Sequence, residues 1–171
     1  MQASKGWAPL VQKLMVETHP DFKLLNFSAS GETTSGGKAR LARLLNKNKV
    51  DVLWIELGGN DGLRGYPTNI ISNNLSEMIV MAKEKGIKVI LTQVQIPLNL
   101  GKRYTSMFVK VFPDVAAKEN VTLMPFFIEK VVLNPQLMQK DQIHPNEEAQ
   151  PIIANTVVNY FKEYLKSLPN R

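Results

Sequence analysis

The sequence predicts an α/β fold with a parallel sheet, and two of its features support that prediction. Short apolar runs alternate along the chain with longer segments whose apolar residues recur at helical spacing. The runs at 51–57 and 88–94 are apolar almost throughout, which is typical of strands buried on both faces. Helices between such strands form crossover connections, and crossovers join parallel strands.

The first part of the chain predicts two helices, two strands and two loops. The first helix has one apolar face and ends at His19-Pro20, because a residue before proline is pushed out of the α region. That face carries Trp7, Leu10, Val11, Leu14 and Met15. We then expect a strand at Lys23–Phe27, a loop at 28–37, a helix at 38–46, a strand at Asp51–Leu57 and a glycine-rich loop at 58–67.

The second part contains the clearest helix, whose stripe is followed by Gly86 in the place of a C-terminal cap. The stripe consists of Ile71, Leu75, Met78, Ile79 and Ala82. After it we expect a strand at Lys88–Val94, a loop at 96–102 and a helix at 103–118 that is interrupted near Pro113. A strand at Val121–Met124 and a helical turn within 125–132 follow. The chain then continues with an irregular stretch at 134–145 and a final helix at 145–167. Ligands bind at the carboxyl ends of parallel strands, so the loops there are where we expect function.

Composition excludes several classes of protein and site. The chain has 171 residues, the size of one domain, and its proportions are globular. It has no cysteine, which excludes a disulfide scaffold, a thiolate zinc site and cysteine catalysis. No apolar run reaches the ~20 residues that span a bilayer. The net charge of +6 identifies no partner, and the basic residues Lys38, Arg40, Arg43 and Lys47 are read as a solvated helix face rather than a nucleic-acid site.

A glycine-rich turn follows the buried strand at Asp51–Leu57. In Gly58-Gly59-Asn60-Asp61 the glycines permit a sharp turn and a close approach to a ligand, and Asn60 offers a side-chain amide as a donor. The alternative is an ordinary tight turn, because Asn, Asp and Gly are common turn residues.

A second motif is Asp141-Gln142-Ile143-His144, followed by Pro145. A carboxylate three residues before a histidine can lie against its Nδ1, which fixes the tautomer and leaves Nε2 as a general base. The alternative is an Asp that caps a helix beside a surface His.

A third motif is Ser28-Ala29-Ser30-Gly31-Glu32-Thr33, after the first expected strand. Gly31 could direct its backbone N–H at a developing oxyanion, while a solvated loop is the alternative, above all for the serines. Together the three motifs supply a base, its orienting acid and two oxyanion donors. This is a hydrolase site without its nucleophile.

On these residues the sequence resembles the SGNH, or GDSL, family of serine esterases, close to its bacterial acyl-CoA thioesterase, lysophospholipase and arylesterase branch. The strings that carry the resemblance are 29–33, 56–65 (ELGGNDGLRG), 125–127 and 141–146. The resemblance implies a three-layer α/β/α flavodoxin-like sandwich, an acyl-enzyme mechanism and no cofactor or metal. It also implies that His144 is the base, Asp141 its partner, and Gly31 and Asn60 the oxyanion donors.

The family's first block, Gly-Asp-Ser, has no counterpart in the 171 residues. That block supplies the nucleophile at the end of the central strand, and the resemblance places Met1–Trp7 just after it. We therefore expect residues 1–171 to form one domain that is N-terminally truncated and lacks its first strand. We also expect this chain by itself to be unstable or rearranged and to have no esterase activity. Ser4, Ser28 and Ser30 do not match the family's serine.

The resemblance also implies the substrate, an acyl ester or thioester. We expect an apolar lining for the acyl chain from Leu63, Tyr66, Pro97, Leu98, Leu137 and Met138, with ordinary loop packing as the alternative. We further expect a monomer without a nucleic-acid partner or stable membrane insertion. No signal peptide is visible, and the resemblance implies a periplasmic location for the complete protein. The alternative function is an inactive protein that binds acyl or anionic ligands.

Overall fold

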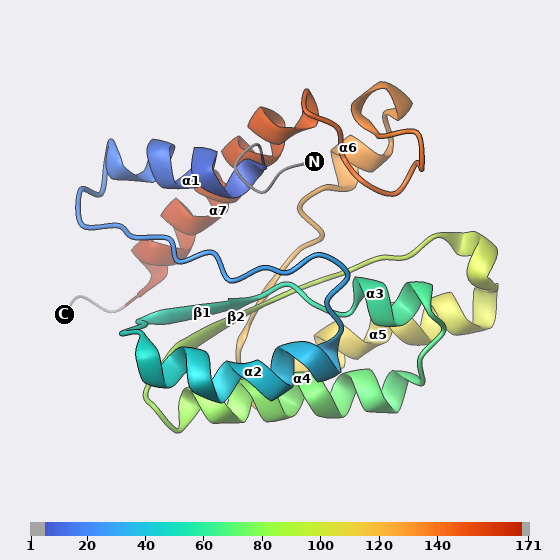
Figure 1. The fold of residues 1–171 in the computed structure, drawn as a ribbon, viewed down its shortest axis with the longest axis horizontal. Coiled ribbons are helices and arrows are strands. Elements are labelled where there is room, and N and C mark those ends of the chain that lie inside the picture. Colours follow the sequence, from blue (N-terminus) through green and yellow to red (C-terminus); the bar gives the residue numbers. More distant parts are fainter. Residues whose placement is uncertain (1–5, 169–171) are drawn as a thin grey trace. The chain divides into compact units, whose positions relative to one another are not determined.

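Three parallel strands form the sheet of this chain in the computed structural model, which describes residues 6–168 (Figure 1). They are β1 (Val52–Ile55), β2 (Lys88–Thr92) and β3 (Thr122–Met124), in the order β1-β2-β3. Val52 lies opposite Lys88, and Ile90 opposite Thr122. Three of the expected strands and their parallel direction are thereby confirmed. Ser4 lies outside the described residues.

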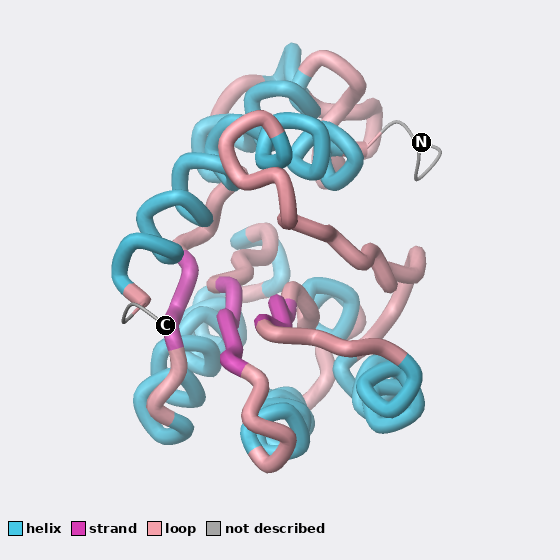
Figure 2. The backbone as a smooth tube through the Cα atoms, turned by 90° about the vertical axis from the view of Figure 1, so that its left-hand side faces the viewer, coloured by secondary structure: helices cyan, strands magenta, loops and turns pink. Residues whose placement is uncertain are grey.

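The sheet belongs to one of two compact units, which spans Ser28–Phe126. Its helices are α2 (Thr34–Lys47), α3 (Gly59–Leu63), α4 (Thr68–Lys83) and α5 (Lys102–Glu119), with a 3-10 turn, η2, at Leu98–Leu100. Helices α4 and α5 pack against the strands, and α2 packs beside α4. Figure 2 shows the strands of the sheet in magenta, side by side, with helices next to them. The whole predicted stripe of α4 is buried, together with Phe108 and Phe112, whose rings meet edge to face at 5.3 Å. Each such side chain contributes roughly 1.5–3 kcal/mol when it is removed from water.

The second unit contains residues 6–27 and 127–168 of the described chain. It consists of α1 (Trp7–Val16), α6 (Glu129–Val132), a 3-10 turn, η3, at Pro135–Leu137, and α7 (Ala149–Ser167). Helix α1 packs along α7, and the backbone N–H of Trp7 donates to Gln150 Oε1 at 3.0 Å. This unit has no strand among its described residues, so its core is made between helices.

The strand expected at Lys23–Phe27 is wrong. These residues join no sheet of the described chain, and Phe27 is 39% exposed. A strand needs a partner ladder, and here the Leu24 N–H instead donates to the Gln12 side chain of α1. The apolar pattern of the segment therefore reflects partial packing rather than strand pairing.

Two helices begin at different residues than expected, because of capping side chains. Helix α2 starts at Thr34 rather than at 38, since Thr33 Oγ1 accepts the Gly36 N–H at 3.3 Å. Helix α7 starts at Ala149 rather than at 145, where Asn146 Oδ1 accepts the Ala149 N–H at 3.2 Å. The loop expected at 58–67 also contains a helix, α3, whose first backbone hydrogen bond runs from the Gly62 N–H to the Gly58 carbonyl at 2.9 Å.

The interruption expected near Pro113 is wrong as well, because α5 runs through it. A proline inside a helix leaves the carbonyl four residues earlier without its usual donor. In α5 that carbonyl belongs to Val109, and it accepts the Gln93 side-chain amide at 3.1 Å. A side chain from the end of β2 thus replaces the missing N–H. Among the described residues, no helix is both long enough and apolar enough to cross a bilayer.

Candidate active site

The turn after β1 carries the first group of candidate residues. Gly58 has φ +111°, a conformation that favours glycine, and a Cβ there would come 3.1 Å from the Phe112 ring. The turn leads directly into α3, which holds Asn60 in its first turn. The glycine that sequence reasoning singled out is therefore required by both conformation and space.

Helix α3 lies against the loop that precedes α2. Asn60 Nδ2 donates to the Glu32 carbonyl at 3.1 Å, and Arg64 Nη2 donates to the Gly31 carbonyl at 3.3 Å. Gly31 has φ +72°, again in the left-handed region. The structure thus brings together the two motifs from which the oxyanion donors Gly31 and Asn60 were predicted.

Asp61 is a residue that sequence reasoning treated only as part of a turn. It is fully buried, and its carboxylate accepts the Thr34 backbone N–H at 2.9 Å and the Thr34 hydroxyl at 2.6 Å. Asn74 of α4 donates to the same hydroxyl at 3.1 Å. Its position in a sharp turn after a buried strand could have indicated this role, because an acid that is buried there needs hydrogen-bond donors from neighbouring segments.

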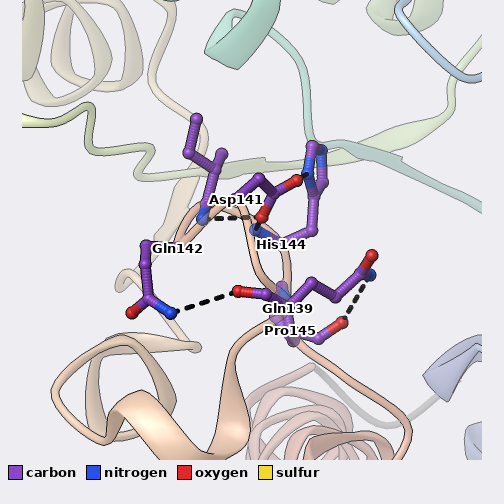
Figure 3. A network of polar contacts seen from close by, with 6 residues as sticks. Gln139, Asp141, Gln142, His144 and Pro145 are labelled. Atoms are coloured by element: carbon purple, nitrogen blue, oxygen red, sulfur yellow. Dashed lines mark hydrogen bonds and ion pairs between the residues drawn. The ribbon is translucent and has the colours of Figure 1, made fainter.

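The second group of candidates is in the helical unit, in the loop before α7 (Figure 3). His144 Nδ1 lies 2.7 Å from Asp141 Oδ2. The other carboxylate oxygen, Oδ1, accepts the backbone N–H groups of Ile143 and His144, both at 3.0 Å. The predicted contact between a carboxylate and the histidine three residues later is therefore present.

This loop is closed by hydrogen bonds from Gln139 to the backbone carbonyls of residues 144 and 145. The Gln139 N–H donates to the His144 carbonyl at 2.7 Å, and Gln139 Nε2 donates to the Pro145 carbonyl at 3.0 Å. Gln142 adopts φ +56°, and its N–H turns back to the Gln139 carbonyl. These contacts hold the backbone on which Asp141 and His144 face each other.

Hydrogen bonding also sets the charge of Asp141. The backbone N–H of His144, then the His144 ring and the backbone N–H of Ile143, hold the pKa of the Asp141 carboxyl well below its usual range. The side chains are exposed, 66% for His144 and 44% for Asp141. The pair is thus an accessible imidazole beside a carboxylate that stays ionised.

The residues expected to line an acyl pocket belong to both units. Leu63, Tyr66, Pro97 and Leu98 are in the sheet unit, and Leu137 and Met138 are in the helical unit. Tyr104 links two of these segments, because its hydroxyl donates to the Tyr66 carbonyl at 2.7 Å. Leu98 is 78% exposed, whereas Met138 is buried.

The sheet unit also has a cavity apart from these residues. A cavity of about 390 Å³ is lined by residues of α4 and the end of α5, and it includes none of the predicted site residues. It is lined by Ser76, Glu77, Val80, Met81, Lys118 and Glu119. Within residues 6–168, no group of three or more His, Asp or Glu side chains is placed to hold a metal ion.

Comparison with known proteins connects these motifs to one family. The sequence profile of the GDSL-like lipase/acylhydrolase family matches residues 2–151. The chain is 43% identical over 165 residues to an arylesterase of Vibrio mimicus, which covers 96% of this chain and 82% of that protein. It is 40% identical over 156 residues to thioesterase 1/protease 1/lysophospholipase L1 of Escherichia coli strain K12, covering 91% of this chain and 73% of that one.

The fold is similar to that of solved esterases. The psychrotrophic esterase EstA from Pseudoalteromonas sp., inhibited by monoethylphosphonate, superposes with a TM-score of 0.94 and 35% sequence identity. That comparison covers 98% of this chain and 91% of the esterase. The α/β fold with its parallel sheet, predicted from the alternation of strands and helices, is confirmed.

Proposed function

Because this chain belongs to the GDSL-like lipase/acylhydrolase family, we propose that it supplies the base and the oxyanion donors of a serine hydrolase for acyl esters and thioesters. The observation that carries the proposal is the His144–Asp141 pair, with Nδ1 and Oδ2 2.7 Å apart. The family supports the class of reaction, and the geometry supports the role that we propose for each residue.

His144 acts as the general base. With Nδ1–H directed at the Asp141 carboxylate, the ring keeps the tautomer in which Nε2 has a free lone pair. Nε2 takes the proton of the attacking serine hydroxyl as the serine oxygen bonds to the acyl carbon. The Asp141 carboxylate then stabilises the imidazolium that forms.

Gly31 and Asn60 stabilise the negative oxygen of the tetrahedral intermediate. An amide nitrogen carries two hydrogens, so Asn60 keeps one for the oxyanion while the other is donated to the Glu32 carbonyl. The Gly31 N–H is the second donor. Donors that are fixed before the reaction lower the barrier without reorganisation.

The intermediate collapses when the carbon–oxygen or carbon–sulfur bond of the leaving group breaks. The leaving alcohol or thiol receives the proton from His144 Nε2, and an acyl-serine remains. Water then attacks this acyl-enzyme with His144 again as base, which releases the carboxylic acid and restores the serine.

The attacking serine is the remaining part of the proposal. No Gly-Asp-Ser string occurs in the 171 residues, and Ser28 and Ser30 are exposed residues on the loop before Gly31. We therefore assign the nucleophile to a serine of a Gly-Asp-Ser segment outside these residues, at the end of a further parallel strand.

Apolar residues in the loops of the sheet unit support a substrate that carries an acyl chain. Leu63, Tyr66, Pro97 and Leu98 are candidates for the lining, and the Tyr104–Tyr66 hydrogen bond joins the loop after α3 to α5. The similar proteins are an arylesterase and a thioesterase/lysophospholipase, which fits acyl groups on different leaving groups. We propose that substrate specificity depends on the acyl chain rather than on the leaving group.

The test is hydrolysis of p-nitrophenyl butyrate by the chain joined behind a Gly-Asp-Ser first strand from a relative. Replacing His144 by Ala is expected to lower kcat by about 10³-fold or more. His19→Ala is the matched control, since His19 is the other histidine and its ring contacts the hydroxyl of the neighbouring Thr18. A loss below tenfold for His144→Ala, or a drop as large for His19→Ala, rules out this role of His144.

A further inference from the structure

We propose that Asp61 is a positioning residue that anchors the Asn60 amide by fastening α3 to the start of α2. The oxyanion role of Asn60 is the one given under the proposed function, on which this inference rests. Asp61 itself touches no substrate in this account. It acts through Thr34, the first residue of α2.

Both oxygens of the Asp61 carboxylate are used by one residue. Oδ2 accepts the Thr34 backbone N–H at 2.9 Å and Oδ1 accepts the Thr34 hydroxyl at 2.6 Å. Asp61 and Thr34 are both fully buried. Hydrogen bonds to a charged acceptor are among the stronger ones, and two of them at one residue fix orientation as well as distance.

A third helix extends the anchor. Asn74 of α4, also buried, donates through Nδ2 to the Thr34 hydroxyl at 3.1 Å and to the Ser35 hydroxyl at 3.0 Å. The Thr34 hydroxyl therefore accepts from Asn74 and donates to Asp61. The network joins α2, α3 and α4 at the end of the sheet unit that carries Gly31 and Asn60.

Asp61 does more than cap α2. Thr33 Oγ1 accepts the Gly36 N–H, whereas Asp61 accepts both the Thr34 N–H and the Thr34 hydroxyl. Asp61 comes from a separate segment and is the direct neighbour of Asn60 in sequence. Because Asn60 and Asp61 are neighbours in α3, we expect a rotation of α3 that breaks the Asp61–Thr34 contact to displace the Asn60 amide from the Glu32 carbonyl as well.

The charge of Asp61 gives the inference a direction that can be tested. A carboxylate beside the oxyanion donor would by itself oppose a developing negative charge. If charge were its main effect, removing it would raise kcat. If its main effect is to hold Asn60, removing it lowers kcat, because a small misplacement of a catalytic donor costs rate.

The experiment compares Thr34→Val, Thr34→Ser and Asp61→Asn with Thr105→Val as a matched control. Thr105 is also a buried threonine near a helix start, but its hydroxyl donates to the Gly101 and Lys102 carbonyls at the start of its own helix. Thr34→Ser keeps the hydroxyl and serves as the conservative rescue. If Asp61→Asn does not fold, the three threonine variants still decide the question.

The first readout is solvent exchange of the Asn60 side-chain amide by NMR, in the 171-residue chain and in the form joined to a Gly-Asp-Ser strand. Exchange is expected to be about tenfold faster in Thr34→Val and Asp61→Asn, and within about twofold of the parent in Thr34→Ser and Thr105→Val. Unchanged exchange in Thr34→Val overturns the inference, whatever the activity.

The second readout is kinetics in the form joined to a Gly-Asp-Ser strand. Thr34→Val and Asp61→Asn are expected to lower kcat by about 10- to 100-fold with KM nearly unchanged. A rise in kcat for Asp61→Asn, or an equal fall for Thr105→Val, overturns the inference. A parent without hydrolysis that depends on His144 contradicts the proposed function instead, while faster amide exchange still supports the anchor.

Discussion

Two aspartates of this chain accept the same kinds of donor in opposite surroundings. Asp61 is fully buried and accepts a backbone N–H and a hydroxyl from Thr34. Asp141 is exposed and accepts two backbone N–H groups and the His144 ring. A carboxylate that accepts backbone N–H groups therefore lies at a buried junction of helices in one unit and in an open loop in the other.

Burial decides what each carboxylate contributes. An unsatisfied buried donor has no water to replace its partner, so loss of Asp61 is expressed as lost stability. At Asp141, water replaces the lost partners, so the fold changes little. What Asp141 alone supplies is the orientation of the imidazole, and its loss is expressed as lost activity.

The largest expected effect is kinetic. Asp141→Asn is expected to lower kcat by about 10³- to 10⁴-fold in the form joined to a Gly-Asp-Ser strand, because an amide favours the wrong His144 tautomer. The melting temperature is expected to fall much less than in Asp61→Asn. Asp114→Asn, at an exposed acid of α5, is the control and should keep full activity. A loss for Asp141→Asn no greater than for Asp114→Asn would remove Asp141 from the mechanism.

The next effect is on stability. Asp61→Asn is expected to lower the free energy of unfolding by about 2–4 kcal/mol, since an amide group next to the Thr34 hydroxyl and N–H cannot accept both hydrogens. Urea unfolding followed by circular dichroism measures the change. Asp141→Asn is the matched variant and should shift the midpoint much less. Equal shifts in the two variants would contradict the role that we give to burial.

The smallest effect is a shift in the pKa of Asp141. A carboxyl whose pKa is lower in the folded chain than in the unfolded chain stabilises the fold above the unfolded value, and this contribution is lost as the pH falls toward the folded value. Carbon-13 NMR of the carboxyl groups should show Asp141 still ionised below the usual value of about 3.9.

The variant His144→Ala separates the causes of that shift. It removes the ring but keeps the backbone N–H groups of residues 143 and 144, and the backbone N–H of residue 144 is the largest cause. The pKa of Asp141 should therefore rise only part of the way to its usual value. Full recovery of the usual value would show that the ring alone sets it.

Periodicity predicted most of the sheet unit because buried runs and amphipathic stripes report burial directly. The strands near 52–55 and 88–92 and the stripe of α4 were found in this way. The strand at 23–27 was predicted wrongly, because a pattern of apolar residues does not show whether a partner ladder exists. The helix at 103–118 was predicted, but its continuity through Pro113 was missed, since the hydrogen bond from Gln93 to the Val109 carbonyl is a contact that no local pattern contains.

The candidate site shows the same limit. The contact of Asp141 with His144 was predictable because it lies within four residues of sequence. The hydrogen bond between Asp61 and Thr34 links segments that are distant in sequence, so the partner of Asp61 could not be predicted from the turn motif. Local chemistry could be inferred from the sequence, and the buried network that holds it required the fold.

The central claim is that the Asn60 amide and the His144 ring serve the same hydrolysis of an ester. Steady-state kinetics of Asn60→Ala and His144→Ala, in the form joined to a Gly-Asp-Ser strand and with p-nitrophenyl butyrate as substrate, tests it most directly. We predict that kcat falls by about 10²-fold or more in each variant, with KM changed by less than about tenfold and the melting temperature unchanged. A loss of kcat below tenfold in either variant would contradict the account.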